Sequence, residues 1–478
     1  MRILLVSHDF LPRHPAGTEI YTNQLGLALR RRGHEVHVFT TEKDIGRTNL
    51  EVGLRRYGDL PVHELVNNLF YNEFQETWDY PPAVASFAEF LDQVSFDVVH
   101  FMHLMYLSVG CLEEVARRKL PVFYTLHDYW LQCPRFGQRV HADRSICHAI
   151  EFKRCGECMS QFKFRQTRIE RALAKGIAAV NRRTGLDLGP PARGLAGRFG
   201  RKQTGLDRDG IVGWEGSPEE PAADSGAQPM QQAIEQRDSA LRRRILPVVD
   251  RFIAPSEFLR SSFVAWGIPE SQIEYLRTGI DLTPFEGFHR EPTDHVRVGF
   301  IGTVVPHKGL HVLLRAWARL PEELTAKHDL RLFGPLQHDP SYVKAIRALS
   351  EEVGAPLRGA LKAEEVAGAL REIDVLVVPS VWYENSPLII LEALATRTPL
   401  VVSDLGGMAE LVEPGRSGER FEVGNPDSLA EVLRGYLEEP ERLGRLYPED
   451  LEVRSVDLDA ERLEHLYEQA KSAQPAQP

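Results

Sequence analysis

The chain has 478 residues, of which 43% are hydrophobic and 26% are charged, as is usual for a globular protein of two or three domains. Its formal net charge of −11 argues against a general nucleic-acid binder. The longest apolar runs are strand-sized, far below the ~20 residues of a membrane span. The opening residues MRILLVSHDF lack a signal-peptide pattern, so we expect a cytoplasmic location.

Apolar strand-sized runs alternate with helical patterns in the first part of the chain. The predicted strands are 2–7, 35–40, 98–101 and 122–126, and the predicted helices between them are 18–32 and 107–118. This β-α-β alternation is typical of a parallel sheet with helices on both faces. Such sheets bind ligands at the carboxyl ends of their strands, so the residues that follow each strand are the candidates for chemistry.

Residues 182–230 interrupt the alternation. They are rich in Gly, Pro, Ala and Ser, with a basic first half and an acidic second half. Such a segment buries too little apolar surface to offset the entropy of ordering it, so it predicts a flexible insertion. We expect structure to resume with a helix at 231–246 and a strand at 251–254.

A second alternation begins near Arg297. The predicted strands are 298–301, 330–333, 357–361, 374–378 and 400–403, with a helix at 310–319. The pattern predicts an α/β protein with two doubly wound domains in tandem, residues 1–285 and 293–450. A C-terminal segment at 451–478 carries a further helix, which we expect to be able to pack back on the first domain.

The clearest chemical pattern follows the strand at 374–378. Glu384 and Glu392 are eight residues apart on either side of a predicted helix start, and Asn385 lies in the loop between them. A helix N-terminus offers free backbone N–H groups and a positive dipole end, which suit a phosphate. A carboxylate further along the helix can accept hydrogen bonds from sugar hydroxyls. The stretch therefore predicts a nucleotide-sugar pocket.

Two turns of small residues occupy equivalent places in the two domains. PAGTE, which contains Gly17, connects the first strand to the first helix, and the turn at 302–309 contains Lys308. Small residues let a phosphate approach the backbone, and a lysine can neutralise a diphosphate. Taken alone, an ordinary helix cap and a solvated surface lysine are the simpler interpretations.

Together these motifs resemble the GT-B glycosyltransferases of family 4, also called group 1, which are retaining nucleotide-sugar enzymes. The resemblance covers nearly the whole chain outside the insertion. It is carried by PAGTE, RRGHEV, APS at 254–256, TGID at 278–281, the turn at 302–309, and the E-x7-E element after VVPS. It implies two Rossmann-like domains facing a central cleft, with the donor bound mainly by the second domain and the acceptor by the first.

The resemblance implies a role for each matching residue. Glu392 would bind the donor ribose, Glu384 would lie near the transferred sugar, and Lys308 would hold the phosphates. The implied donor-binding set is Gly17, Gly302, Lys308, Asn385, Leu388, Ile389 and Glu392, in which Leu388 and Ile389 contribute backbone N–H groups. Thr303 stands where the family often has an arginine, so one of two cationic phosphate anchors is missing. Arg277 or a residue of the first domain could replace it.

His127 and Asp128 end the TLHD strand of the first domain. The resemblance implies that His127 lies near the sugar and the acceptor, with Asp128 orienting its imidazole. We therefore assign His127, Asp128 and Glu384 as the candidate catalytic residues. The simpler interpretation of His127 is a structural histidine at a strand end.

The function that the resemblance implies is transfer of a sugar from a UDP-, GDP- or ADP-sugar to a saccharide or lipid-linked acceptor, in cell-surface polysaccharide or glycolipid synthesis. No D-x-D motif follows a strand in a suitable place, so we expect catalysis without a metal cofactor. A catalytically impaired nucleotide-sugar-binding or scaffold subunit and a sugar-nucleotide epimerase are the alternatives.

Four cysteines follow the HDYW sequence, and the last two form a C-x2-C pair of the kind found in zinc sites. They are Cys133, Cys147, Cys155 and Cys158. In a cytoplasmic protein, four clustered thiols are explained better by a structural zinc than by disulfides, with His141 and His148 as substitute ligands. Scattered reduced thiols or a redox-labile pair are the alternative.

Residues 152–175 carry seven Lys or Arg against two Asp or Glu, a net charge of +5, with Phe152, Phe162 and Phe164 between them. In an acidic protein this basic segment indicates contact with anionic lipid head groups at the inner face of a membrane, or with a lipid-diphosphate acceptor. A solvated basic helix is the simpler interpretation.

Overall fold

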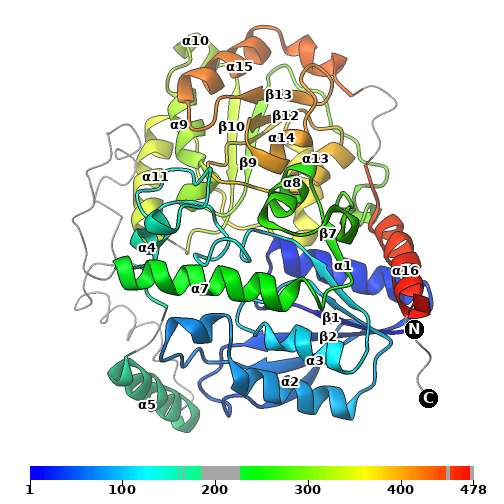
Figure 1. The fold of residues 1–478 in the computed structure, drawn as a ribbon. Helices are drawn as coiled ribbons and strands as arrows, with labels where there is room; N and C mark the ends of the chain where they lie inside the picture. Colours follow the sequence, from blue (N-terminus) through cyan, green and yellow to red (C-terminus); the bar gives the residue numbers. More distant parts are fainter. Residues whose placement is uncertain (161, 165–166, 185–226, 338, 448–452, 474–478) are drawn as a thin grey trace.

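The computed structural model describes residues 1–160, 162–164, 167–184, 227–337, 339–447 and 453–473 (Figure 1). These residues form two α/β domains, each built on its own sheet. The first domain, coloured from blue to green, lies below the second, coloured from yellow-green to orange, in Figure 1.

The first sheet has eight strands in the order β3-β4-β2-β1-β5-β6-β7-β8, and every pair is parallel except β3 with β4. The strands are β1 (Arg2–Val6), β2 (Glu35–Glu42), β3 (Val52–Tyr57), β4 (Leu60–Val66), β5 (Val98–Phe101), β6 (Val122–Thr125), β7 (Arg251–Ala254) and β8 (Ile273–Tyr275). Central strands β5 and β6 are buried along their whole length, because helices cover both faces of a parallel sheet.

The first-domain helices include α1 (Gly17–Arg31), α2 (Pro81–Gln93), α3 (Gly110–Arg117), α4 (Phe152–Ser160), α5 (Arg168–Thr184), α7 (Ala227–Ile245) and α8 (Glu257–Trp266). Helix α4 packs against the start of α7. The fully buried guanidinium of Arg237 on α7 donates to the backbone oxygens of Trp130 at 2.6 Å and Leu131 at 3.0 Å. This contact fixes the chain as it leaves β6.

The second sheet is parallel throughout, with the order β10-β9-β11-β12-β13. Its strands are β9 (Arg297–Ile301), β10 (Asp329–Phe333), β11 (Val375–Val378), β12 (Leu400–Ser403) and β13 (Gly418–Phe421). The helices of this domain are α9 (Leu310–Trp317), α10 (Glu322–Thr325), α11 (Pro340–Glu352), α12 (Val366–Arg371), α13 (Leu388–Ala395), α14 (Gly406–Glu410) and α15 (Pro426–Glu438).

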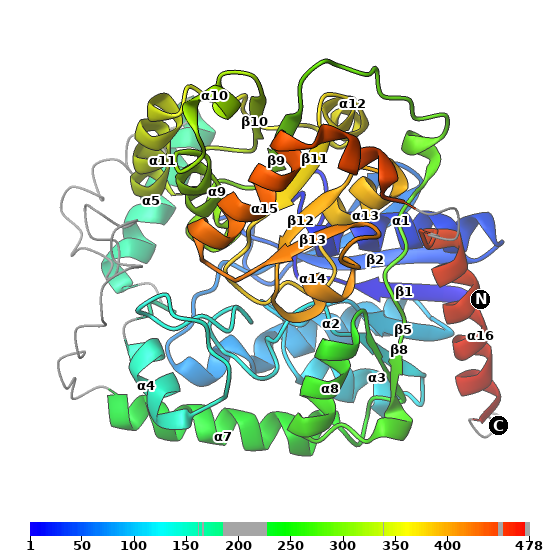
Figure 2. The same ribbon diagram turned by 90° about the horizontal axis from the view of Figure 1, so that it is seen from above.

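The last helix, α16 (Val456–Ala473), returns to the first domain and packs beside α1 (Figure 2). Buried Asp459 on α16 accepts hydrogen bonds from the Tyr21 hydroxyl at 2.9 Å and from the Gly279 backbone N–H at 2.7 Å. The two chain crossings between the domains lie side by side. Ile280 N donates to Arg454 O at 3.1 Å, and Val456 N donates to Ile280 O at 2.9 Å.

Some predicted elements differ from the structure. The strand expected at 357–361 is wrong: only Leu357 pairs, in a single bridge to Leu332, and Gly359 with a φ of +83° turns the chain away. The predicted bounds of the insertion, 182–230, were too wide at both ends, because helix α5 extends to Thr184 and helix α7 begins at Ala227. Its remaining residues, 185–226, lie outside the described residues.

No helix in the part of the chain that the structure describes combines the length and the apolar character needed to cross a bilayer.

Candidate active site

Two glycines that follow β9 and β10 bring three strand ends of the second domain together. Gly309 has a φ of +72°, and a Cβ there would lie 1.8 Å from the backbone oxygen of Pro379. A Cβ on Gly334, after β10, would lie 1.8 Å from the backbone oxygen of Gly302. Only glycine allows these approaches. They place Lys308 against the loop that follows β11.

Lys308 and Glu384 form a partly buried ion pair. The Lys308 Nζ lies 2.5 Å from Glu384 Oε1, which also accepts a hydrogen bond from Ser380 Oγ at 2.9 Å. Burial acts to raise the pKa of Glu384, but the charge of Lys308 and the hydrogen bonds from Lys308 and Ser380 outweigh it, so the pKa lies below its ordinary value. Glu384 is therefore a buried, ionised carboxylate.

Helix α13 begins directly after this loop. Its N-cap is Pro387, which has no side-chain oxygen to cap the helix, and the first N–H groups of a helix have no partner within it. Leu388 and Ile389 thus present backbone donors next to Glu384. Glu392 follows on the second turn, where burial raises its pKa to about 7. This end of α13 can bind a phosphate, with a carboxylate one turn deeper.

Asn385 joins the two domains at this point. Its amide Nδ2 donates to the backbone oxygen of His127 at 2.7 Å. The His127 imidazole has a pKa lowered to about 3, first by burial and then by the charge of His103, so it is neutral. Two of the predicted catalytic residues, His127 and Glu384, are therefore brought to the same interdomain cleft from opposite sides.

Asp128 differs from the prediction that it orients His127. Its Oδ2 lies 3.0 Å from Nε2 of His103, and its Oδ1 accepts from the backbone N–H of Trp130 at 2.7 Å. Successive side chains at a strand end point to opposite sides, so Asp128 turns away from its neighbour. Asp128 orients His103, which follows β5, instead.

Three first-domain residues at this edge are missing from the sequence-based set: His8, Glu19 and His103. The rings of His8 and His103 are 4.5 Å apart, and His8 Nε2 lies 3.6 Å from Glu19 Oε1. Burial raises the pKa of Glu19 to about 8, and within the described residues its buried oxygens accept no hydrogen bond. The sequence could have indicated these residues, because His8 and His103 follow strands β1 and β5 and Glu19 belongs to the PAGTE turn.

Gly17 begins α1 at an exposed position on the same edge. No atom lies within 4 Å of a Cβ built there, so the start of the helix is open. The structure gives Gly17 no crowding of the kind found at Gly309, and its assignment to donor binding stays a prediction.

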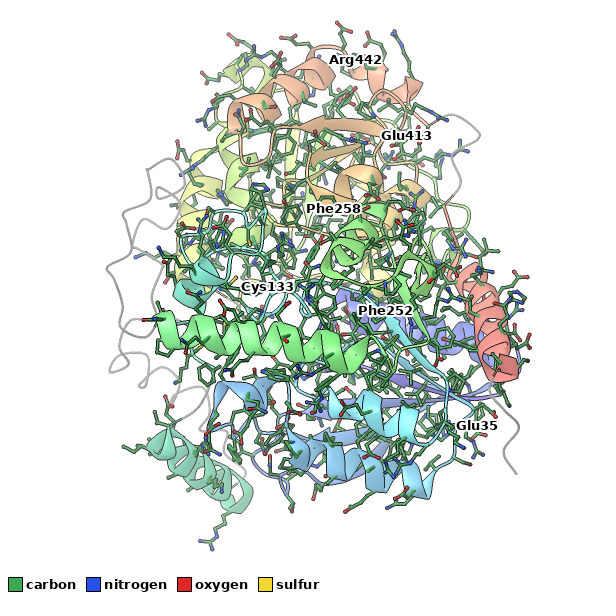
Figure 3. The ribbon with its side chains drawn as sticks, viewed as in Figure 1. Glu35, Cys133, Phe252, Phe258, Glu413 and Arg442 are labelled. Carbon is green, nitrogen blue, oxygen red and sulfur yellow. The ribbon has the colours of Figure 1, made fainter. Side chains whose placement is uncertain are left out.

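The four clustered cysteines line one small cavity together with His141. Figure 3 labels Cys133, in the loop near α4 and α7. Cys155 and Cys158 lie on helix α4 and not on a chelating turn, because a spacing of three residues also fits one helical turn. Among the described residues, no group of three or more His, Cys, Asp or Glu side chains is arranged to hold a metal ion. Zinc binding stays a prediction.

Two family models match the chain. Residues 285–449 match the group 1 glycosyltransferases, and residues 15–179 match glycosyltransferase family 4. An uncharacterised glycosyltransferase of Methanocaldococcus jannaschii is 28% identical over 90% of this chain and 87% of its own length. D-inositol 3-phosphate glycosyltransferase of Mycolicibacterium smegmatis is 28% identical over 40% of this chain and 47% of its own. The match thus spans about half the length of the inositol phosphate relatives.

Solved structures share the fold. Sucrose-phosphate synthase from Thermosynechococcus elongatus superimposes with a TM-score of 0.59 over 99% of both chains, at 18% identity. HepE of Anabaena, solved in complex with UDP and glucose, superimposes with a TM-score of 0.56 over 98% of this chain and 97% of its own, at 15% identity.

Proposed function

Because the chain belongs to the group 1 glycosyltransferases with the GT-B fold, we propose that it transfers a sugar from a nucleotide-sugar donor to a saccharide or lipid-linked acceptor with retention of the anomeric configuration. We place this reaction in the assembly of cell-surface polysaccharide or glycolipid. The proposed donor is a UDP-, GDP- or ADP-sugar. The UDP and glucose held by HepE, which has the same fold, support this class.

One observation carries the proposal: Lys308, Glu384 and the open start of α13 meet His127 of the first domain at one point of the cleft. Lys308 and the helix dipole of α13 suit the two phosphates of a donor. Glu392, one turn deeper, suits the ribose hydroxyls. The transferred sugar would then lie between Glu384 and His127.

The chemistry needs charge stabilisation and positioning more than proton transfer to the protein. The bond between the sugar C1 and the leaving phosphate oxygen breaks, and the acceptor oxygen bonds to C1 from the same face. The acceptor proton passes to the leaving phosphate. Ionised Glu384 stabilises the positive charge that develops at C1, and Lys308 stabilises the leaving diphosphate. Neutral His127 holds a sugar hydroxyl.

Arg135 is the best candidate for the cation that Thr303 does not supply. It lies in the loop after β6, and its charge contributes to the lowered pKa of His307, the neighbour of Lys308. Arg135 therefore lies within electrostatic range of the turn that carries Lys308. We propose that it takes the second cationic place when the cleft holds a donor.

A panel of nucleotide sugars tests the activity. We expect one donor of the UDP-, GDP- or ADP-sugar class to be hydrolysed slowly or transferred, with product of unchanged anomeric configuration by NMR. The reaction should survive EDTA added at the assay stage, because Lys308 and α13 take the role that a divalent cation plays elsewhere. A donor that binds but never turns over would identify a binding subunit instead. A loss of activity with EDTA that added Mg²⁺ or Mn²⁺ restores would contradict the metal-free mechanism.

We also propose that α5 contacts an anionic lipid surface. The helix carries five Lys or Arg and one Glu, and Arg171 and Lys175 attach it to the first domain through the ring of Phe70 at 5.6 and 5.3 Å. Ile169 and Leu173, one turn apart, are 73% and 62% exposed. Exposed apolar side chains on a basic helix suit the boundary between head groups and acyl chains.

Flotation with vesicles measures this contact. The protein is expected to float with vesicles rich in anionic lipid and not with zwitterionic ones. Ile169→Ser/Leu173→Ser should lose most of the bound fraction, since each buried apolar side chain contributes about 2 kcal/mol. Leu54→Ser is the matched control, because Leu54 is equally exposed at 68% but lies on β3. Equal flotation of all three proteins would assign the contact elsewhere and overturn the proposal.

A further inference from the structure

The four clustered cysteines come from three separate segments. Cys133 follows the end of β6, Cys147 belongs to a hairpin in which its N–H donates to Arg139 O at 2.8 Å, and Cys155 and Cys158 lie on α4. Their convergence therefore depends on the fold of the whole loop and not on local spacing. We define residues 131–150 as the cysteine loop.

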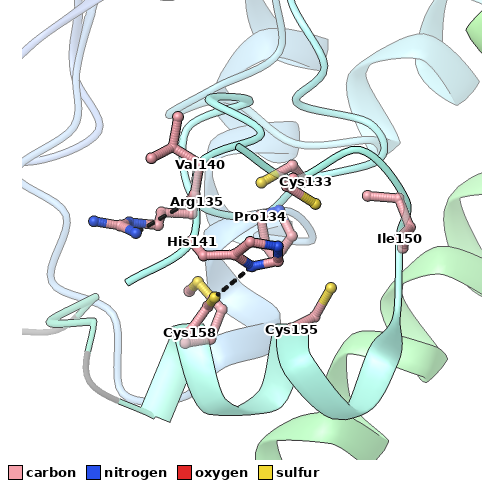
Figure 4. A pocket seen from close by; sticks show the side chains of 10 residues that line it. Cys133, Pro134, Arg135, Val140, His141, Ile150, Cys155 and Cys158 are labelled. Carbon is pink, nitrogen blue, oxygen red and sulfur yellow. Dashed lines mark hydrogen bonds between the residues drawn. The ribbon is translucent and has the colours of Figure 1, made fainter. Parts of the chain in front are cut away.

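The cavity between the thiols has the size of a single ion. Its volume is about 20 Å³, and the lining includes all four cysteines, His141 and Met159. A void needs about 10–15 Å³ to hold one water molecule, so this volume suits one ion or one water-sized group. Figure 4 shows the His141 ring among the sulfurs of Cys133, Cys155 and Cys158, with its hydrogen bond to Cys158 at 3.4 Å, while the side chain of Arg135 points away.

We infer that Cys133, Cys147, Cys155 and Cys158 form a structural zinc site that fixes the cysteine loop against the active-site cleft. Soft thiolates favour zinc, copper(I) and iron over Mg²⁺ and Ca²⁺, and four of them complete the tetrahedral shell of a structural zinc. His141 Nδ1 lies 3.4 Å from Cys158 Sγ, where it would donate a hydrogen bond to the zinc-bound thiolate and orient it.

Metal binding requires the thiols to turn. As the side chains stand, no three of the described His, Cys, Asp or Glu groups are arranged around an ion. A cysteine has a single side-chain torsion with three staggered positions, so its sulfur can move while the backbone stays. All four cysteines already line the cavity, and a structural zinc site forms together with its metal.

The cysteine loop contacts both sides of the active-site cleft, so a metal that orders the loop would also stabilise the cleft. A Cβ on Gly137, whose φ is +70°, would lie 2.6 Å from the Asp128 carboxyl carbon, so the loop rests directly on the first-domain side of the cleft. On the other side, His148 Nδ1 is hydrogen-bonded to the Tyr383 hydroxyl at 2.7 Å. Tyr383 precedes Glu384. Zinc would thus hold a bridge between the TLHD strand end and the donor loop.

A second contact supports the same bridge. The buried guanidinium of Arg139 donates to the backbone oxygens of Cys147 and His148 and to Gln132 Oε1, at 2.8–3.0 Å. It also lies 5.7 Å from the Tyr383 ring centre. The loop is therefore organised around one arginine on its cleft side and the four thiols on its α4 side.

Metal analysis of untagged protein, purified with reductant and without chelator, tests the site. We expect about one zinc per chain, and a thiolate-to-cobalt absorption band with tetrahedral d–d bands after exchange with Co²⁺. Cys133→Ser and Cys158→Ser should each lose most of the metal. Cys111→Ala is the matched control, because Cys111 is buried on α3 outside the cluster, and it should keep a full equivalent.

Two measurements on the wild-type protein test the same site without variants, which could fail to fold. A thiol reagent should find four more reactive thiols after zinc is removed than before. Limited proteolysis should then cut within residues 131–150, which the loaded protein protects. Metal-free protein with four titratable thiols and a resistant loop would overturn the inference, as would a disulfide between any two of these cysteines under reducing conditions. None of these readouts depends on the proposed sugar transfer.

Discussion

Replacing Lys308 by methionine is expected to lower turnover by about 10²–10³-fold, the usual loss when one group that stabilises transition-state charge is removed. Methionine keeps most of the apolar stem and removes only the charge that faces the leaving diphosphate. The same change leaves Glu384 buried without its cation, which we expect to cost about 3 kcal/mol of the free energy of unfolding. Steady-state kinetics and denaturant unfolding measure the two effects separately.

A double variant distinguishes catalysis from stability. Lys308→Met/Glu384→Gln removes both charges, so the stability should return toward that of the wild type while turnover stays low. Lys344→Met serves as the control, because Lys344 is exposed on α11, and it should leave both quantities unchanged. Recovery of turnover in the double variant would mean that Lys308 acts only through folding, and would contradict its assignment to the diphosphate.

Glu392→Ala is expected to weaken donor binding by about 10–100-fold, since hydrogen bonds to a charged group contribute about 1.5–3 kcal/mol. The carboxylate should also make this binding depend on pH. Ribose hydroxyls donate to the ionised form, and burial raises the pKa of Glu392 to about 7 in the free protein. The donor dissociation constant should therefore fall as the pH rises through 7 and level off above it.

Calorimetric titration at several pH values measures this dependence. Glu392→Gln should remove it, because an amide does not titrate. Glu19→Gln is the matched control: burial raises the pKa of Glu19 to about 8, so it titrates in a similar range, but from the first-domain side of the cleft. If the pH dependence disappeared in Glu19→Gln and persisted in Glu392→Gln, the ribose would have to be assigned elsewhere.

The donor side of the cleft could be predicted because its signals are local. Glu384, Pro387 and Glu392 belong to one strand-loop-helix unit, and Lys308 lies in one turn after a strand. Most strands of the two sheets could be predicted for the same reason, since these buried strands are short and strongly apolar, but β4, β8 and β13 were not predicted. The resemblance to the group 1 and family 4 glycosyltransferases, which the two family matches confirm, predicted the GT-B architecture.

Other features depend on contacts between distant parts of the chain. Asn385 meets His127 across 258 residues, and only the orientation of the two domains decides that contact. The partner of Asp128 could not be read from its neighbour in sequence, because the side-chain direction at a strand end decides it. Strand β3 was missed since its residues alternate in exposure, as expected of an edge strand.

The paired chain crossings limit how the cleft can open. Ile280 is hydrogen-bonded to both Arg454 and Val456, so the two connections are joined to each other at this point. A rotation of the domains about this point would keep these bonds, whereas sliding one domain over the other would break them. Lys308 and Glu384 belong to the same domain and travel together. The hydrogen bonds from Asn385 to the His127 backbone and between His148 and Tyr383 both join the two sides of the cleft, so an opening of the cleft would have to break them.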